Sequence, residues 1–307
     1  MPIWKEYLLA HSLTEALQIL ASSNHPTRLL AGGTDLLIDL QQGRCTPVHT
    51  LVDIHAIDEL CALELRGSEF FIGAAVPMVK IVASTLVKKH ACALGQACGL
   101  VGGPQVRNMA TLGGNVAHAL PAADGTIALL SLDAQAEVAD LQGRRRLPLR
   151  DLFIAPGQTI LTDKPGILVG FYIQQAGSGE TSVFKRVMRP QGVALPIINM
   201  AFWLRRRLDY IDDIRIALGP AGIIPFRAVI VEQILRGCEY SKDIQLIALD
   251  ALEKSVQFRS SPQRASAAYR RHLAENLFAE LLDQAWFQAA SSLSVVGDKN
   301  HDNQPDC

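Results

Sequence analysis

The segment Leu29-Leu30-Ala31-Gly32-Gly33-Thr34-Asp35-Leu36 places two glycines between an apolar run and a threonine. A similar segment, Thr111-Leu112-Gly113-Gly114-Asn115, lies further along the chain. Glycine lets the backbone approach a ligand and direct consecutive N–H groups at an anion, and a threonine hydroxyl adds a donor. One Gly-Gly-Thr turn alone is more often structural, because turns need glycine for positive φ. Two together predict a cradle for a diphosphate, although neither matches G-x-G-x-x-G or the P-loop.

Short helices and strands surround these two segments. Ser12 and Glu15 form a capping box, which predicts a helix starting at about Ser12. Apolar residues and turn signals place the other elements of this half of the chain. Strands are expected at residues 27–31, 48–54, 135–140 and 166–173, a hairpin at 61–74 turning near Gly67, and mostly helix at 77–100 and up to about 132.

The segment from Gln174 to Thr181 is polar and rich in glycine and serine, which is typical of a linker. Beyond it, strands are expected at 183–187, 197–206 and 214–218, and helices from about Arg227, Lys242 and Ser266. Three strands followed by three helices predict a small α+β domain. The tail 291–307 has little to bury and is predicted to be disordered.

Composition excludes several classes of protein. The 307 residues carry a formal net charge of -1, which gives no electrostatic footprint for nucleic acid. The single basic run, Arg144 to Arg146, is interpreted as a solvated turn. Six cysteines without C-x-x-C spacing predict no metal or iron–sulfur site in this chain. Neither a signal peptide nor a membrane span is recognised, so a cytoplasmic location is expected.

A longer pattern of motifs carries a family resemblance. The second diglycine segment continues through Val116-Ala117 and is followed by Pro121-Ala122-Ala123-Asp124. Further matching segments are Gly103-Pro104-Gln105-Val106-Arg107-Asn108, Ala217-Leu218-Gly219-Pro220-Ala221, and Arg264-Ala265-Ser266 with Tyr269-Arg270. With these motifs the chain resembles the FAD-binding medium subunit of molybdenum hydroxylases, the family of xanthine dehydrogenase and carbon monoxide dehydrogenase. The resemblance covers nearly the whole chain outside the tail.

The resemblance implies an α+β fold with two domains. Residues 1–174 would form an FAD-binding domain of the vanillyl-alcohol-oxidase (PCMH) type, in two lobes at about 1–55 and 56–174. Residues 175–290 would form a domain like the C-terminal domain of carbon monoxide dehydrogenase flavoproteins. The tail follows at 291–307.

The family's cofactor contacts carry over by position. The two diglycine segments, Leu29 to Leu36 and Thr111 to Asn115, would hold the FAD diphosphate, and Asp124 would accept a hydrogen bond from the cofactor. Val101, Leu168 and Lys185 match further contact positions. Each has a plainer interpretation: Val101 and Leu168 as core residues, and Lys185 as a solvated surface lysine. Asp124→Ala is expected to weaken FAD retention at little cost to folding.

The implied function is that of an electron-transfer subunit with noncovalently bound FAD, in which His118 is a bystander. Iron–sulfur clusters in a small partner subunit would deliver electrons from a molybdenum cofactor in a large partner subunit. The acceptor stays open among NAD, a quinone, ferredoxin and oxygen, because Arg189 to Pro196 departs from the acidic pattern of xanthine dehydrogenases. No catalytic residue set is expected in this chain, since the cofactor supplies the chemistry.

Two other functions stay open at this point. The chain could be an assembly subunit that keeps the fold but holds no redox-active flavin. Alternatively, it could be a self-contained flavin oxidase of the same fold with its own substrate pocket. The intact glycine segments argue against the first, and the short second domain argues against the second.

Overall fold

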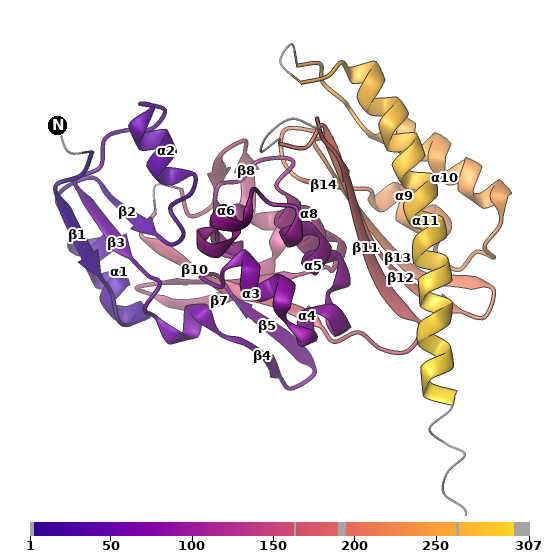
Figure 1. Ribbon diagram of the computed structural model, residues 1–307, viewed down its shortest axis with the longest axis horizontal. Coiled ribbons are helices and arrows are strands. Elements are labelled where there is room, and N and C mark those ends of the chain that lie inside the picture. The colour runs from indigo at the N-terminus through magenta and orange to yellow at the C-terminus, as the bar shows by residue number, and fades with distance from the viewer. Residues whose placement is uncertain (1–2, 163, 190–194, 262–263, 298–307) are drawn as a thin grey trace, which may run out of the picture.

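The structure is a computed structural model that describes residues 3–162, 164–189, 195–261 and 264–297. Three main sheets follow one another along the chain, and each packs against its own helices (Figure 1). The helices α5 (Cys92–Gly99) and α8 (Asp124–Ser131) lie between the second and third sheets. The molecule is therefore a row of layers in which helices separate the sheets.

The first sheet is parallel and has the strand order β1-β3-β2. Its strands are β1 (Glu6–Leu9), β2 (Thr27–Leu30) and β3 (Thr50–Asp53). Helix α1 (Leu13–Ser22) begins after Ser12, whose side chain accepts a hydrogen bond from the Glu15 amide at 3.1 Å. This cap confirms the predicted helix start. Helix α1 buries its apolar side between this sheet and the second one, while α2 (Leu36–Gln41) packs on the strands with a small core of its own.

The second sheet is antiparallel, with the strand order β4-β5-β10-β6-β7. Its strands are β4 (Leu63–Arg66), β5 (Glu69–Gly73), β6 (Gln135–Asp140), β7 (Gly143–Pro148) and β10 (Gly166–Gln174). The remaining helices of this region are α3 (Met78–Ala83), α4 (Thr85–His90), α6 (Pro104–Met109) and α7 (Leu112–Ala117), and a small hairpin pairs β8 (Phe153–Ala155) with β9 (Gln158–Thr159). The basic run that the sequence suggested to be a solvated turn is part of strand β7. There Arg144 pairs with Glu59, and Arg146 pairs with Glu69 at 2.8 Å.

The third sheet is antiparallel and has the order β11-β12-β13-β14. It consists of β11 (Glu180–Val187), β12 (Ile198–Arg207), β13 (Tyr210–Gly219) and β14 (Phe226–Arg227). Helices α9 (Val229–Leu235), α10 (Lys242–Ser255) and α11 (Ala267–Gly297) cover its outer face (Figure 1). Its inner face packs against the helices of the second sheet through side chains such as Phe184 and Trp203. The last two sheets therefore share one continuous core.

Helix α11 extends through Ser291 to Gly297, beyond the residue at which the sequence predicted a disordered tail to begin. Residues 291–296 contain no glycine or proline that would end a helix, and the run of polar residues that suggested disorder starts only at Gly297. The start of the predicted tail therefore moves to the end of this helix. Residues 298–307 lie outside the described part of the chain.

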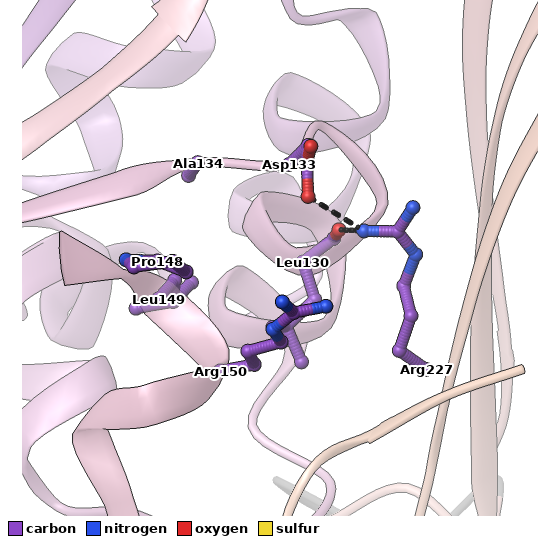
Figure 2. A pocket seen from close by; sticks show the side chains of 7 residues that line it. All are labelled: Leu130, Asp133, Ala134, Pro148, Leu149, Arg150 and Arg227. Carbon is purple, nitrogen blue, oxygen red and sulfur yellow. Dashed lines mark hydrogen bonds and ion pairs between the residues drawn. The ribbon is translucent and has the colours of Figure 1, made fainter. Parts of the chain in front are cut away.

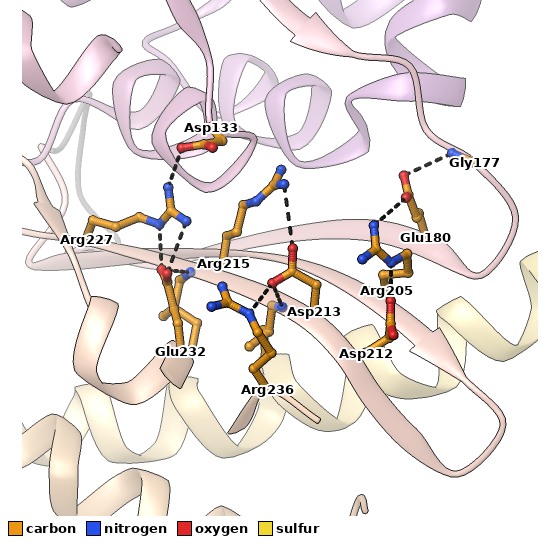
Figure 3. Close-up of polar contacts among 12 residues, drawn as sticks. Asp133, Gly177, Glu180, Arg205, Asp212, Asp213, Arg215, Arg227, Glu232 and Arg236 are labelled. Atoms are coloured by element: carbon orange, nitrogen blue, oxygen red, sulfur yellow. Dashed lines mark hydrogen bonds and ion pairs between the residues drawn. The ribbon is translucent and has the colours of Figure 1, made fainter. Parts of the chain in front are cut away.

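Arg227 ties the third sheet to the end of α8. Its Nη1 donates to the Leu130 carbonyl at 3.3 Å and to Asp133 at 2.8 Å, beside the shallow pocket of Figure 2. The same guanidinium pairs with Glu232, which is 2% exposed and whose Oε1 also accepts the Ile216 amide at 2.8 Å (Figure 3). The Arg227 side chain thus links the end of α8 to Glu232 of α9, and its ion pairs stabilise the packing of α8 on the third sheet.

We expect Asp133→Asn to lower the free energy of unfolding by up to about 1 kcal/mol, since Asp133 is half exposed and solvent screens its charge. Asparagine tolerates the left-handed conformation of this residue, φ 54°, so backbone strain should not contribute. Urea unfolding measures the change. A loss above about 2 kcal/mol would contradict this weak, screened pairing.

Candidate functional site

The first diglycine segment packs closely on the chain just ahead of the second one. A Cβ built on Gly32 would overlap the Met109 carbonyl oxygen, and it would lie 2.7 Å from the carbonyl carbon of that residue. Met109 and Ala110 directly precede Thr111, the first residue of the second segment. The first segment therefore meets the backbone of the two residues directly ahead of the second segment. Glycine is required at position 32 by this close approach.

The first segment offers amide groups with no partner. It leaves the carboxyl end of β2, turns at Gly33 with φ 69°, and enters α2 at Leu36. Among the residues that the structure describes, no acceptor is bonded to the N–H groups of Gly32, Gly33 or Thr34. These residues are only partly buried. A row of partly exposed donors beside a helix start is suited to bind an anion.

The second segment differs from the expectation. Thr111 caps α7, and its Oγ1 accepts the Gly114 amide at 3.1 Å. The Leu112 and Gly113 amides donate to the carbonyls of Val76 and Ala74, at 3.1 and 2.7 Å. These N–H groups are thus used within the fold and are not available to a ligand. The predicted second row of anion donors is replaced by a tightly packed helix start.

At Gly114, by contrast, the second segment leaves space beside its backbone. A Cβ on Gly114 would meet only Thr111 Oγ1, at 3.0 Å. Asn115 uses its Oδ1 to accept from the Thr126 amide at 3.2 Å, which leaves its Nδ2 donor available. Close approach of a ligand at Gly114 is therefore sterically possible.

Asp124 follows at the first turn of α8 and is 5% exposed. Its carboxylate pairs with Arg186 of β11 and accepts from Asn199 Nδ2 of β12 at 2.7 Å. Burial raises the pKa of Asp124, whereas the Arg186 charge and the Asn199 hydrogen bond oppose that rise. The Arg186 Nε and Asn199 Oδ1 atoms are buried without partners. Asp124 therefore joins α8 to two strands of the third sheet, and each of its two partners has a buried polar atom without a hydrogen bond.

The other predicted contacts are distributed around this centre. Val101 is half-buried between α5 and α6, and its carbonyl accepts from Arg107 at 3.2 Å. Leu168 is buried on β10; the carbonyl of the next residue, Val169, accepts the Ala74 amide at 2.9 Å, directly beside Gly113. Leu168 is thus close to α7, although its side chain belongs to the core.

Lys185 lies apart from the other predicted residues. It forms an ion pair with Glu280 of α11, on the outer face of the sheet. Neighbouring residues of a strand point to opposite faces, so Arg186 and not Lys185 faces Asp124. The cofactor contact of Lys185 stays a prediction that its placement does not support. Sequence reasoning missed Arg186 and Asn199. The one available signal for Arg186 is its place next to Lys185 in a predicted strand, where neighbouring side chains point to opposite faces.

Comparison with known families assigns the chain. Residues 4–173 match the FAD binding domain in molybdopterin dehydrogenase, and residues 182–285 match the CO dehydrogenase flavoprotein C-terminal domain. The chain belongs to the FAD-binding subunits of the molybdenum hydroxylases. The predicted family and the α+β fold, with an FAD-binding domain before a flavoprotein C-terminal domain, are confirmed.

Individual relatives of the FAD subunit agree over nearly the full length. The putative xanthine dehydrogenase FAD-binding subunit of Escherichia coli is 31% identical over 94% of this chain and 98% of its own. The glyceraldehyde dehydrogenase medium chain of Sulfolobus acidocaldarius is 32% identical over 88% and 94%. The solved carbon monoxide dehydrogenase of Hydrogenophaga pseudoflava aligns with a TM-score of 0.87 at 26% identity, covering 93% of this chain and 98% of the other.

Membrane-spanning helices and metal-binding groups of side chains are both absent from the described residues of the FAD subunit. No helix in the described ranges is long and apolar enough to cross a membrane. Within the same ranges, no three histidine, cysteine, aspartate or glutamate side chains come together to hold a metal ion.

Thr111→Ala should destabilise the FAD subunit by about 1 kcal/mol, because α7 loses its N-cap. Ser12→Ala removes the equivalent cap of α1 and should cost a similar amount. Only Thr111→Ala is expected to weaken FAD binding, since Thr111 directly follows Met109 and Ala110, which pack on Gly32, whereas Ser12 caps α1. Flavin titration and urea unfolding of both variants and of Thr111→Ser, which should restore both properties, provide the measurement.

Proposed function

We propose that this chain binds FAD noncovalently and acts as the electron-transfer subunit of a molybdenum hydroxylase complex. The observation that carries the proposal is the row of unpaired amides from Gly32 to Thr34, in a segment that packs on Met109 and Ala110, directly ahead of the second diglycine segment. Amides of this kind bind the oxygens of a diphosphate without needing a basic side chain. The proposed cofactor-binding residues are those of the segments 29–36 and 111–115, together with Asp124, Val101 and Leu168.

The chain's own residues would bind and orient the cofactor. Gly32, Gly33 and Thr34 would donate hydrogen bonds to the phosphate oxygens, and Gly114 would allow close approach. The unpaired atoms Arg186 Nε and Asn199 Oδ1 would offer a donor and an acceptor next to the Asp124 pair. Bound FAD would supply the exchange of one and two electrons. Both the donor set and the orphaned polar atoms fit a ligand that carries phosphates and hydroxyls.

We further infer that partner subunits complete the electron path. Relatives are named as a medium chain or an FAD-binding subunit, which implies other chains in the complex. A small subunit with iron–sulfur clusters and a large subunit with the molybdenum cofactor would deliver electrons, and NAD or another acceptor would receive them. For the domains we propose residues 1–174 and 175–290, because β10 ends at Gln174 and β11 begins the third sheet at Glu180.

Gly114→Val tests the cofactor assignment. The substitution should remove most bound FAD at a cost to stability of only about 1 kcal/mol, because the one atom that has to yield is the Thr111 hydroxyl that caps α7. Gly99→Val is the matched control: it also adds a side chain to a half-buried helical glycine, and its Cβ meets only Val82 at 3.8 Å. Flavin absorbance and thermal melting are measured for both. Full FAD content in Gly114→Val would overturn the proposed site.

The alternative functions give different results in the same experiments. A colourless wild-type chain that takes up no added FAD would be an assembly subunit. Turnover of an organic substrate by the isolated chain would identify a self-contained oxidase. A pull-down from the native source, followed by metal and flavin analysis, would identify the partners directly.

A further inference from the structure

Four arginines gather where α11 begins. Arg270 lies in the first turn of that helix and is 4% exposed. Its Nη1 donates to the Arg259 carbonyl at 2.7 Å, and its Nε is buried with no partner. Arg189, which follows β11, donates to the Arg264 carbonyl at 3.0 Å. The side chains of Arg189 and Arg270, from two separate segments, thus reach the backbone of the stretch that carries Arg259 and Arg264.

These arginines differ from three nearby arginines in what they contact. Arg205, Arg227 and Arg236 each pair with a carboxylate (Figure 3). Within the described ranges, by contrast, Arg189, Arg259, Arg264 and Arg270 form no ion pair. Their described partners are backbone carbonyls, including that of Gly222, which accepts from Arg259 at 3.3 Å. A carbonyl satisfies a donor but does not neutralise a charge.

The positive charges therefore act on one another. Burial lowers the pKa of Arg270, and the charges of Arg264 and Arg259 lower it further. Guanidinium groups stay protonated in proteins, so the repulsion is not relieved by proton loss. An anion that binds among them would remove this repulsion and would fill the bonding capacity of the buried Nε.

The cluster adjoins the proposed cofactor site without being part of it. Arg189 follows three residues after Arg186, the partner of Asp124. Gly219, at the end of β13, packs so closely on Pro121 and Ala122 that its Cβ would lie 3.0 Å from the Ala122 Cα. The Gly222 carbonyl that holds Arg259 is three residues further along.

We propose that Arg189, Arg259, Arg264 and Arg270 form a binding site for a phosphate-bearing anion. Guanidinium groups bind phosphate oxygens in pairs, and a ligand with two phosphates matches several such groups at once. Two kinds of ligand carry such phosphate groups. One is free phosphate or diphosphate, and the other is a dinucleotide electron acceptor, which contains a diphosphate. The site is separate from the diglycine segments, so it does not depend on the FAD assignment.

Binding of inorganic pyrophosphate to the full chain loaded with FAD tests the site, by equilibrium dialysis at low ionic strength. The double variant Arg259→Gln, Arg264→Gln changes only exposed side chains and should weaken binding at least about tenfold. The control is Arg28→Gln, Arg207→Gln, which removes two exposed arginines from β2 and from the opposite end of the third sheet. It should bind pyrophosphate like the wild type.

Competition identifies the source of the phosphate. If NADH displaces pyrophosphate and loses affinity in the same variant, the ligand is a dinucleotide; if NADH does not compete, the site takes a free phosphate. Three results would overturn the proposal. They are no saturable binding by the wild type, equal weakening in both double variants, or loss of FAD from Arg259→Gln, Arg264→Gln, which would place these arginines in the cofactor site itself.

Discussion

Gly32→Ala should abolish FAD binding and lower the free energy of unfolding by about 3 kcal/mol or more. The added methyl group would overlap the main-chain carbonyl of Met109. Because the clash is with backbone, no change of rotamer relieves it, and the first diglycine segment has to move away from Met109 and Ala110. That movement would displace the unpaired amides of Gly32 to Thr34 relative to the second segment.

Urea unfolding and flavin titration measure both effects of Gly32→Ala. Gly177→Ala is the control, since neither glycine has a positive φ and the nearest atom to a Cβ at Gly177 is 3.7 Å away, on the Glu180 side chain. Gly43→Ala adds a second control for strain: its φ is 65° with nothing within 4 Å, and it should cost about 1 kcal/mol. Near-normal FAD binding by Gly32→Ala would show that this close packing is not needed for FAD binding.

Breaking the Asp124–Arg186 pair is the second large effect. Asp124→Ala leaves the Arg186 charge buried without a partner. Arg186→Ala leaves the Asp124 carboxylate buried without its positive partner. Each should cost about 3–5 kcal/mol. The sequence alone suggested little cost to folding for Asp124→Ala. The structure changes that expectation, because both oxygens of this carboxylate bind residues of the third sheet.

A double-mutant cycle isolates this pair. The variant with both substitutions should be more stable than the sum of the single losses predicts, by up to about 3 kcal/mol. FAD retention should fall in both single variants, because each disturbs the end of α8 next to the proposed site. Losses below about 1 kcal/mol in both single variants would show that water, rather than the partner residue, satisfies these charges.

Local signals in the sequence predicted much of the fold. Strand β6 has the predicted bounds, and the predicted cap at Ser12 begins α1. Strand β1 was missed because its four residues are all exposed and show no buried alternation. In the site, the two diglycine segments were singled out by their similar composition and the family resemblance, and the structure brings the first of them against the residues just ahead of the second.

The rest of the site depends on contacts between distant residues. The amides of Leu112 and Gly113 bond to carbonyls of Val76 and Ala74, which no local pattern announces. Asp124, Arg186 and Asn199 come from three elements in two domains. Their contact follows from how the sheets pack, and spacing along the chain does not reveal it.

Helix α8 has a consequence for motion between the domains. All eight of its residues are buried, and it is held at both ends: Asp124 by Arg186, and the Leu130 carbonyl and Asp133 by Arg227. One attachment would act as a pivot, whereas two that are about 12 Å apart resist rotation. We therefore expect the two domains to move as one rigid body about α8, and not to open between them.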